Sequence, residues 1–442
     1  MPNPPNILLI VSDDHRHSAM SCVDGPLADP VQTPHLDALA ARGTRMTHAY
    51  HAGSWSAAVC MPSRAMLHSG RGPFDLPRDM AQVPEASLGT PAGDATLGGL
   101  LGQAGYRTHH IGKWHNNEEP FCRSFQSGEA VMIGGMPHDH FQTPMENWDG
   151  QALSPMFLSN CHGTDVFAEA ARAFLYQHAN ADDDRPFFLS LAFTAPHDPR
   201  VTHPEYHTRF PIDQIELPPN FTPDPALRPD LLPIRDNLSL TLPRDPEAMK
   251  REIAGYYAMV EHLDHGIGRV LDQLDTTGLA EDTLVIYTAD HGHAVGQHGL
   301  LAKQYSYDHS LRVPLLAAGP GIPKGRTCDA LCYQHDLFPT LLHTAGITDT
   351  PTAFEDLTPC LTGQRDHHRP WVGCYYTDEW RTVSDGNTKL VQRLLPHDRG
   401  FTRFDLERDP WETTPIATGP DDPLHAALTD WQQWSGDPLG SA

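Results

Sequence analysis

The sequence predicts an α/β fold in which a large domain has a central, mostly parallel sheet flanked by helices. Three apolar runs that suit buried strands, at residues 6–12, 187–193 and 283–288, alternate along the chain with helical patterns. Each run is followed closely by Asp or His residues. Because ligands of such folds bind at the carboxyl ends of the strands, we expect these polar side chains to form one site.

The remaining elements of the large domain follow from turn residues and apolar spacing. One helix is expected over residues 34–43 and a second over 96–105, each ending at a glycine, with a strand following at 106–111. The twelve prolines at 196–246 exclude long helices there. The apolar residues of 249–274 recur at helical spacing, which predicts a long helix lying against the sheet.

A smaller C-terminal subdomain is expected over residues 366–442, after a large domain over 1–365. Short strand-like pieces at 371–376 and 388–394 precede a helix that begins at Pro423. We therefore predict an antiparallel sheet with one helix in this part of the chain.

The net charge argues against two kinds of partner. Lys and Arg total 31 and Asp and Glu total 56, so the formal charge is -25. Such a surface repels nucleic acid and anionic membranes.

The N-terminus lacks a basic start, a long apolar stretch and a small-residue cleavage site, so the sequence predicts that there is no secretory signal. We expect a cytoplasmic protein that binds neither nucleic acid nor membranes. The eight cysteines lack zinc-ribbon spacing and are expected to be reduced thiols.

Two clusters of residues suit chemistry on an anion. Cys60 precedes Pro62 at the start of a predicted helix, where the positive end of the helix dipole stabilises an anionic group. Taken alone, this pattern equally suits a buried thiol. Asp13, Asp14 and Asp290 offer hard oxygen ligands for calcium, magnesium or manganese, although an Asp pair after a strand also suits a turn.

Several motifs, taken together, resemble those of the sulfatase family. Cys60-Met61-Pro62-Ser63-Arg64, followed by Ser69-Gly70-Arg71, is similar to the signature of that family. The other matching motifs, in family order, are Asp13-Asp14, Thr33-Pro34-His35-Leu36-Asp37, Gly112-Lys113-Trp114-His115, Ala195-Pro196-His197-Asp198, Thr288-Ala289-Asp290-His291-Gly292, Lys303 and residues 405–412. The resemblance covers nearly the whole chain and implies an alkaline-phosphatase-like fold.

The resemblance also implies an activity: hydrolysis of a sulfate monoester, the O-sulfate of a carbohydrate or another small alcohol. A maturation enzyme would oxidise Cys60 to formylglycine, whose hydrate is the nucleophile, and a divalent metal, most often calcium, would bind beside it. The implied catalytic residues are Cys60, Arg64, Lys113, His115, His197 and Lys303. The implied metal ligands are Asp13, Asp14, Cys60, Asp290 and His291, the last as a ligand or as a donor behind the ligands.

The resemblance suggests a mechanism as a hypothesis. Arg64 and the metal would hold the hydrate, which attacks sulfur, and His197 with Lys303 would protonate the departing oxygen. His115 would then take the proton of the second hydroxyl, while Lys113 steadies the sulfate. A cation is expected because a sulfate monoester repels ordinary nucleophiles.

The substrate is less constrained by the sequence. We expect the segments 116–163 and 199–248 to form the rim of the cleft, with polar and aromatic side chains for a hydroxyl-bearing ligand. The rim candidates are Asn116, Asn117, His138, Asp139, His140, Trp148 and Arg200, with Tyr375, Tyr376, Asp378 and Arg381 from the C-terminal part.

Three other activities stay open at this point. A phosphonate monoester or phosphodiester hydrolase shares the formylglycine and the metal pair. A non-catalytic relative that only binds anions would lack some of the catalytic residues, and none of the expected residues is missing from this sequence. A thiol enzyme could use Cys60 directly. The oligomeric state is left open.

Overall fold

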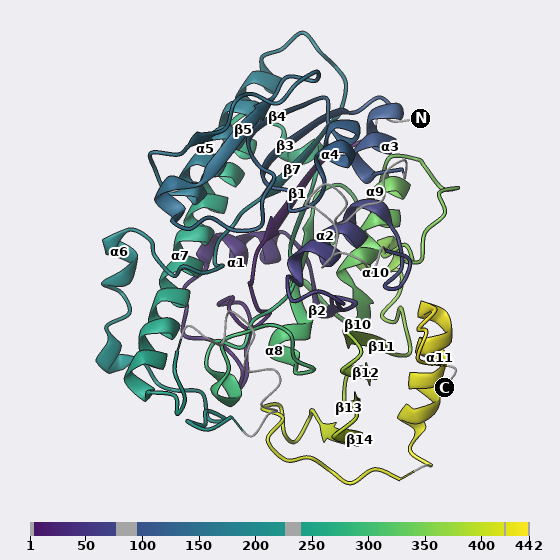
Figure 1. The fold of residues 1–442 in the computed structure, drawn as a ribbon. Coiled ribbons are helices and arrows are strands. Elements are labelled where there is room, and N and C mark those ends of the chain that lie inside the picture. The colour runs from purple at the N-terminus through teal and green to yellow at the C-terminus, as the bar shows by residue number, and fades with distance from the viewer. Residues whose placement is uncertain (1–3, 77–94, 226–239, 420, 441–442) are drawn as a thin grey trace.

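A computed structural model describes residues 4–76, 95–225, 240–419 and 421–440 of the chain, which form a large and a small sheet (Figure 1). The strands of the large sheet are β1 (Asn6–Ser12), β2 (Gly43–Tyr50), β3 (Arg107–Lys113), β4 (Ser127–Met132), β5 (Pro144–Trp148), β6 (Phe157–Leu158), β7 (Phe187–Ala192), β8 (Thr283–Ala289), β9 (Arg312–Ala318) and β10 (Arg326–Tyr333). Their order is β10-β2-β9-β8-β1-β7-β3-β4-β5-β6. Five of the pairings are parallel and four are antiparallel, which confirms a mostly parallel sheet.

Helices cover both faces of this sheet. The helices are α1 (Pro34–Ala41), α2 (Cys60–Ser69), α3 (Leu97–Gln103), α4 (Glu118–Ser124), α5 (Gly163–Ala179), α6 (Pro204–His207), α7 (Pro246–Thr276), α8 (Asp308–Leu311), α9 (Leu337–Thr344), α10 (Thr358–Leu361) and α11 (Pro423–Ser435). One face packs against α1, α5 and α7, and the other packs against α2, α3, α4, α9 and α10 (Figure 1).

The central strand β1 shows why its apolar run is continuous. Ile7 and Leu9 belong to the core on the face of α2, whereas Leu8 and Ile10 belong to the core on the face of α7. Side chains of a strand alternate between the two faces, so a strand covered on both sides must be apolar throughout. The prediction of a doubly buried strand at 6–12 is confirmed.

The predicted helices form, with shifted ends. The helix expected at 249–274 is α7, which begins at Pro246 because the Asp245 side chain accepts a hydrogen bond from Glu247 N. Strand β2 was not predicted. It begins at Gly43, where the sequence indicated only the end of a helix, and a Cβ atom at Gly43 would lie 1.9 Å from Ala317 O of β9. This glycine allows the close approach of the two strands.

The C-terminal part contains the predicted antiparallel sheet and helix. Its strands are β11 (Val372–Tyr376), β12 (Trp380–Ser384), β13 (Thr388–Leu395) and β14 (Asp398–Asp405), paired in that order, and α11 packs on the sheet. The boundary at residue 365 stays a prediction. None of the described helices has a stretch long and apolar enough to cross a membrane.

Four rim predictions were wrong. Tyr376 is buried in a hydrophobic cluster with other residues of the C-terminal part. Arg381 is completely buried and its Nε donates to Asp437 Oδ2 at 2.7 Å, while Tyr375 packs in the core beneath α11. Trp148 belongs to the main core, where its indole N–H donates to Phe125 O at 2.8 Å. These large amphipathic side chains satisfy their polar atoms internally, so their polarity does not indicate exposure.

Candidate active site

The ends of two neighbouring strands create the centre of the site. β1 and β8 are parallel and in register up to Ser12 and Ala289, so the residues that follow them lie side by side. Asp14 N donates to Asp290 Oδ1 at 3.3 Å. The three predicted acidic residues Asp13, Asp14 and Asp290 are all buried. The expectation that these strand ends converge is confirmed.

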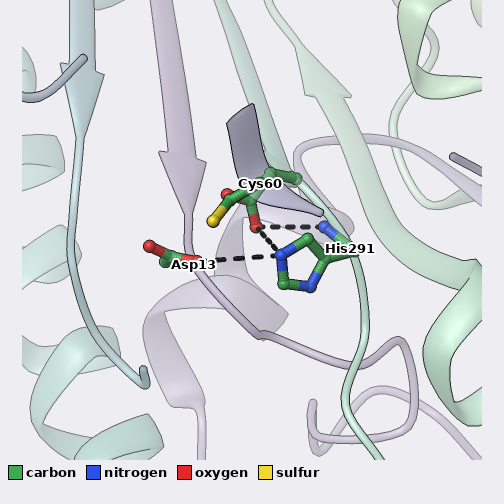
Figure 2. Close-up of side chains that lie close together, drawn as sticks. Asp13, Cys60 and His291 are labelled. Atoms are coloured by element: carbon green, nitrogen blue, oxygen red, sulfur yellow. Dashed lines mark hydrogen bonds and ion pairs between the residues drawn. The ribbon is translucent and has the colours of Figure 1, made fainter. Parts of the chain in front are cut away.

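Helix α2 brings Cys60 to this centre. Atoms of Asp13, Cys60, Asp290 and His291 that could bind a metal all lie within 4.8 Å of one another, and Figure 2 shows Asp13, Cys60 and His291 close together. One turn along α2, Arg64 Nε donates to Asp290 Oδ2 at 2.9 Å. This bond ties the helix that carries Cys60 to the end of β8.

The side chains that face one another fit a divalent cation. Asp13 Oδ1, Asp14 Oδ2 and His291 Nε2 are buried and have no hydrogen-bond partner among the described residues. His291 Nδ1 lies 2.9 Å from Gly292 O, a contact in which it donates its proton and leaves the Nε2 lone pair open to a ligand. Buried carboxylate oxygens without a hydrogen-bond partner are costly, and a cation beside Asp13 and His291 would satisfy Asp13 Oδ1 and His291 Nε2. Asp14 belongs to a second group of possible ligands, with Asp13 and His197.

The carboxylates also repel one another. Burial and the neighbouring charge of Asp13 raise the pKa of Asp290. Burial acts in the same direction on Asp13, but the charges of Lys113, His197 and Arg64 outweigh it and hold the pKa of Asp13 well below its usual range. A cation would relieve this repulsion.

Positive side chains surround the acidic centre. Lys113 forms an ion pair with Asp13, and Lys303 Nζ lies 2.8 Å from Asp14 Oδ1. Lys303 Nζ also lies 3.0 Å from His197 Nε2. Burial opposes protonation of His197, but the charges of Asp14 and Asp13 and a hydrogen bond to Asp198 together outweigh burial and raise the pKa of His197 to about 9. An anion bound here would meet two ammonium groups and an imidazolium.

His115 completes the group of predicted residues. Burial lowers the pKa of His115, against the effects of the Cys60 charge and of a hydrogen bond to Cys60. Burial would raise the pKa of the Cys60 thiol, yet the charges of Lys113 and His115 bring it well below its usual value. His115 (φ 53°) and Asp14 (φ 66°) both adopt the left-handed backbone region, a strain that is common at functional sites.

Some predicted rim residues lie near the site. His140 Nε2 lies 3.0 Å from His197 O, and Arg200 Nη2 lies 3.1 Å from Nε2 of His293. The sequence did not indicate His293, whose Nε2 lies 4.0 Å from Asp14 Oδ2, although its place two residues after His291 was a usable signal. It also gave no signal for Gln334, whose Nε2 donates to Asp290 O at 2.8 Å.

Comparison with known proteins shows consistent similarity. Residues 5–347 match the family model described as Sulfatase, and residues 296–429 match the one described as N-sulphoglucosamine sulphohydrolase, C-terminal. A choline-sulfatase of Rhizobium meliloti is 29% identical, with 96% of this chain and 84% of that protein covered. An N-acetylglucosamine-6-O-sulfatase of Bacteroides thetaiotaomicron is 26% identical, with 94% and 81% covered.

Solved structures share the fold. One, in complex with its substrate D-glucosamine-2-N,6-O-disulfate, has a TM-score of 0.79 and 23% identity, with 99% of both chains covered. A phosphonate monoester hydrolase of Agrobacterium radiobacter has a TM-score of 0.72 and 22% identity, with 97% of this chain and 94% of that chain covered. The alkaline-phosphatase-like fold expected from the sequence is confirmed.

Proposed function

Because this chain belongs to the sulfatase family, we propose that it hydrolyses a sulfate monoester at Cys60, after conversion of Cys60 to formylglycine, with calcium as the bound cation. The convergence of Asp13, Asp290 and His291 on Cys60 is the observation that carries this proposal. These residues come from two separate segments of the chain, and Asp13 Oδ1 and His291 Nε2 have no hydrogen-bond partner among the described residues beside the residue that would be modified.

The cation and the modified residue have distinct tasks in this proposal. A bound cation would hold the sulfate oxygens, and an aldehyde hydrate at residue 60 would supply an oxygen nucleophile with a second hydroxyl. Asp13, Asp14, Asp290 and His291 would hold the cation. Calcium, magnesium and manganese all suit this set of oxygen and nitrogen ligands, and the family favours calcium.

The side chains around this centre bind the sulfate and move protons. Lys113 and Lys303 would bind sulfate oxygens, since each has its ammonium group at the acidic centre. His197 Nδ1 is engaged by Asp198 O at 2.9 Å, so Nε2 is the atom that would deliver a proton to the departing oxygen. His115 would accept a proton at residue 60, and Arg64 would hold that residue together with Asp290.

We propose a carbohydrate or another small alcohol as the product of the reaction. The names of two relatives, a choline-sulfatase and an N-acetylglucosamine-6-O-sulfatase, both refer to sulfate esters of alcohols. The structural likeness to a protein bound to D-glucosamine-2-N,6-O-disulfate supports the same class. Alkoxides are poor leaving groups, and the His197–Lys303 pair would provide the proton that such a substrate needs.

The structural likeness to a phosphonate monoester hydrolase defines the competing activity. The chain should be produced together with a formylglycine-generating enzyme, and kcat/KM compared on 4-nitrophenyl sulfate, bis(4-nitrophenyl) phosphate and a phenylphosphonate monoester. We expect the highest value on the sulfate ester. A higher value on the phosphonate monoester, absent in the Cys60→Ala control, would assign the chain to the competing activity.

A further inference from the structure

Asp14 is held in an unusual conformation at the acidic centre. Its φ of 66° lies in the left-handed region, a strained conformation for a residue with a side chain unless its surroundings compensate. This backbone directs the side chain so that Oδ1 accepts from Lys303 at 2.8 Å, while Oδ2 has no hydrogen-bond partner among the described residues and lies 3.9 Å from His197 Nε2. A peptide that relaxed to negative φ would turn this carboxylate away.

One residue outside the centre holds this turn. The hydroxyl of Tyr256 donates to Asp14 O at 2.9 Å and accepts from Arg16 N at 3.0 Å, so it bridges the two ends of the turn 14–16. Tyr256 is completely buried and belongs to α7, which lies 242 residues further along the chain. Its ring is fixed beneath the Arg200 guanidinium, 5.0 Å from the ring centroid.

We propose that Tyr256 is a positioning residue that keeps Asp14 in the conformation needed to bind the cation. This inference rests on the proposed metal role of Asp14. Tyr256 contacts backbone atoms of the turn, and through them it sets the direction of the Asp14 carboxylate. Partners behind the ligands of a metal site orient the ligands, and removing one such partner typically weakens metal binding about 10- to 100-fold.

The test uses Tyr256→Phe, which removes only the hydroxyl and keeps the ring under Arg200. The matched control is Tyr333→Phe. Tyr333 is also completely buried, and its hydroxyl donates to Gly373 O at 2.9 Å and accepts from Gly373 N at 2.7 Å, beside the C-terminal sheet. The two variants therefore lose the same pair of backbone hydrogen bonds, one inside the active-site turn and one outside it.

Calcium binding to the metal-free full-length chain is measured by titration calorimetry, with Tm and kinetics alongside. We expect the Kd for calcium to rise about 10-fold or more in Tyr256→Phe and to stay at the wild-type value in Tyr333→Phe. In Tyr256→Phe, added calcium should restore much of kcat, because the lost step is cation binding.

Two results would overturn the inference. A wild-type Kd in Tyr256→Phe shows that the turn does not need the hydroxyl. Equal rises in Kd in both variants, each matched by a lower Tm, assign the effect to general destabilisation. If the wild-type chain itself binds no calcium, magnesium or manganese, the metal part of the proposed function fails together with this inference.

Discussion

Nε2 of His197 and Nζ of Lys303 lie 3.0 Å apart, and Asp14 faces both groups, with its Oδ1 atom 2.8 Å from the Lys303 ammonium. The pair joins the segment after β7 to the segment after β8. Since Asp198 O accepts from the other imidazole nitrogen of His197, Nε2 is the nitrogen that faces the Lys303 ammonium, and the two groups lie together beside the acidic centre. This arrangement suits proton donation to a leaving oxygen.

His197→Ala is expected to slow hydrolysis of an alkyl sulfate much more than hydrolysis of 4-nitrophenyl sulfate. General acid catalysis contributes typically about 10²–10⁴-fold when the leaving group needs a proton, and nitrophenolate leaves without one. The measurement is kcat/KM on both esters. The exposed His343 of α9 supplies the control, His343→Ala, which should match the wild type. Equal losses on the two esters would contradict the role of His197 as the acid.

Removal of the cation is expected to abolish turnover and to lower Tm. Without a cation, Asp13 Oδ1, Asp14 Oδ2 and His291 Nε2 stay buried with no hydrogen-bond partner among the described residues. A ligand present at 100 times its Kd stabilises the folded state by about 2.7 kcal/mol. Tm should therefore fall in EDTA and recover with calcium.

Asp290→Ala provides the control for the effect of the cation. This variant lacks one proposed ligand and should show a much smaller calcium-dependent rise in Tm than the wild type. An active wild-type enzyme whose Tm is the same in EDTA and in excess calcium would rule out a bound structural and catalytic cation.

Asp264→Asn is expected to change how stability depends on pH. Asp264 accepts the backbone N–H of Leu36 at 2.8 Å at the start of α1, and burial raises the pKa of Asp264 from 3.8 to about 7. Because the pKa of Asp264 is higher in the folded protein than in the unfolded chain, protonation of Asp264 favours folding. This contribution to stability is complete below the pKa of the unfolded chain, near pH 4, and is lost as the pH rises through 7. Asparagine carries no charge and keeps one acceptor oxygen for Leu36 N, while the bond from His35 N to the second oxygen is lost at every pH.

The stability of the variant relative to the wild type should therefore rise between about pH 4 and about pH 7 and level off above pH 7. Each unit of pKa difference corresponds to about 1.4 kcal/mol, so the gain is measurable as the free energy of unfolding in urea. Asp272→Asn, at an exposed position of α7, the helix that also carries Asp264, should show no such trend. A difference between variant and wild type that stays constant with pH would contradict the account.

Much of the site could be predicted because its residues stand next to strong local patterns. Asp13 follows one apolar strand, Asp290 follows another, and Cys60 begins a helix that has a proline in its first turn. The positions of these three residues in the fold could therefore be predicted from the order of the elements. The sequence could also indicate α7 from its apolar spacing. In these cases the local pattern and the tertiary environment agree.

Other features depend on contacts between distant segments, which a single sequence does not show. Tyr256 stands on the apolar face of α7 and has the pattern of a core residue, yet its hydroxyl reaches the turn after β1. In the sheet, strand β2 lies between β9 and β10, two strands that are far from β2 in the sequence. Arg381 is charged and was therefore expected at the rim of the cleft, but it pairs with Asp437 inside the C-terminal part.

The central claim is that residue 60 acts as an aldehyde hydrate, and it is tested by combining mass spectrometry of the peptide containing residue 60 with turnover of a sulfate ester. Protein produced with a formylglycine-generating enzyme should carry formylglycine at residue 60, with activity proportional to the converted fraction. Cys60→Ala should fold, bind sulfate and show no turnover. Full activity from a chain whose Cys60 is an intact, fully alkylatable thiol would contradict the account.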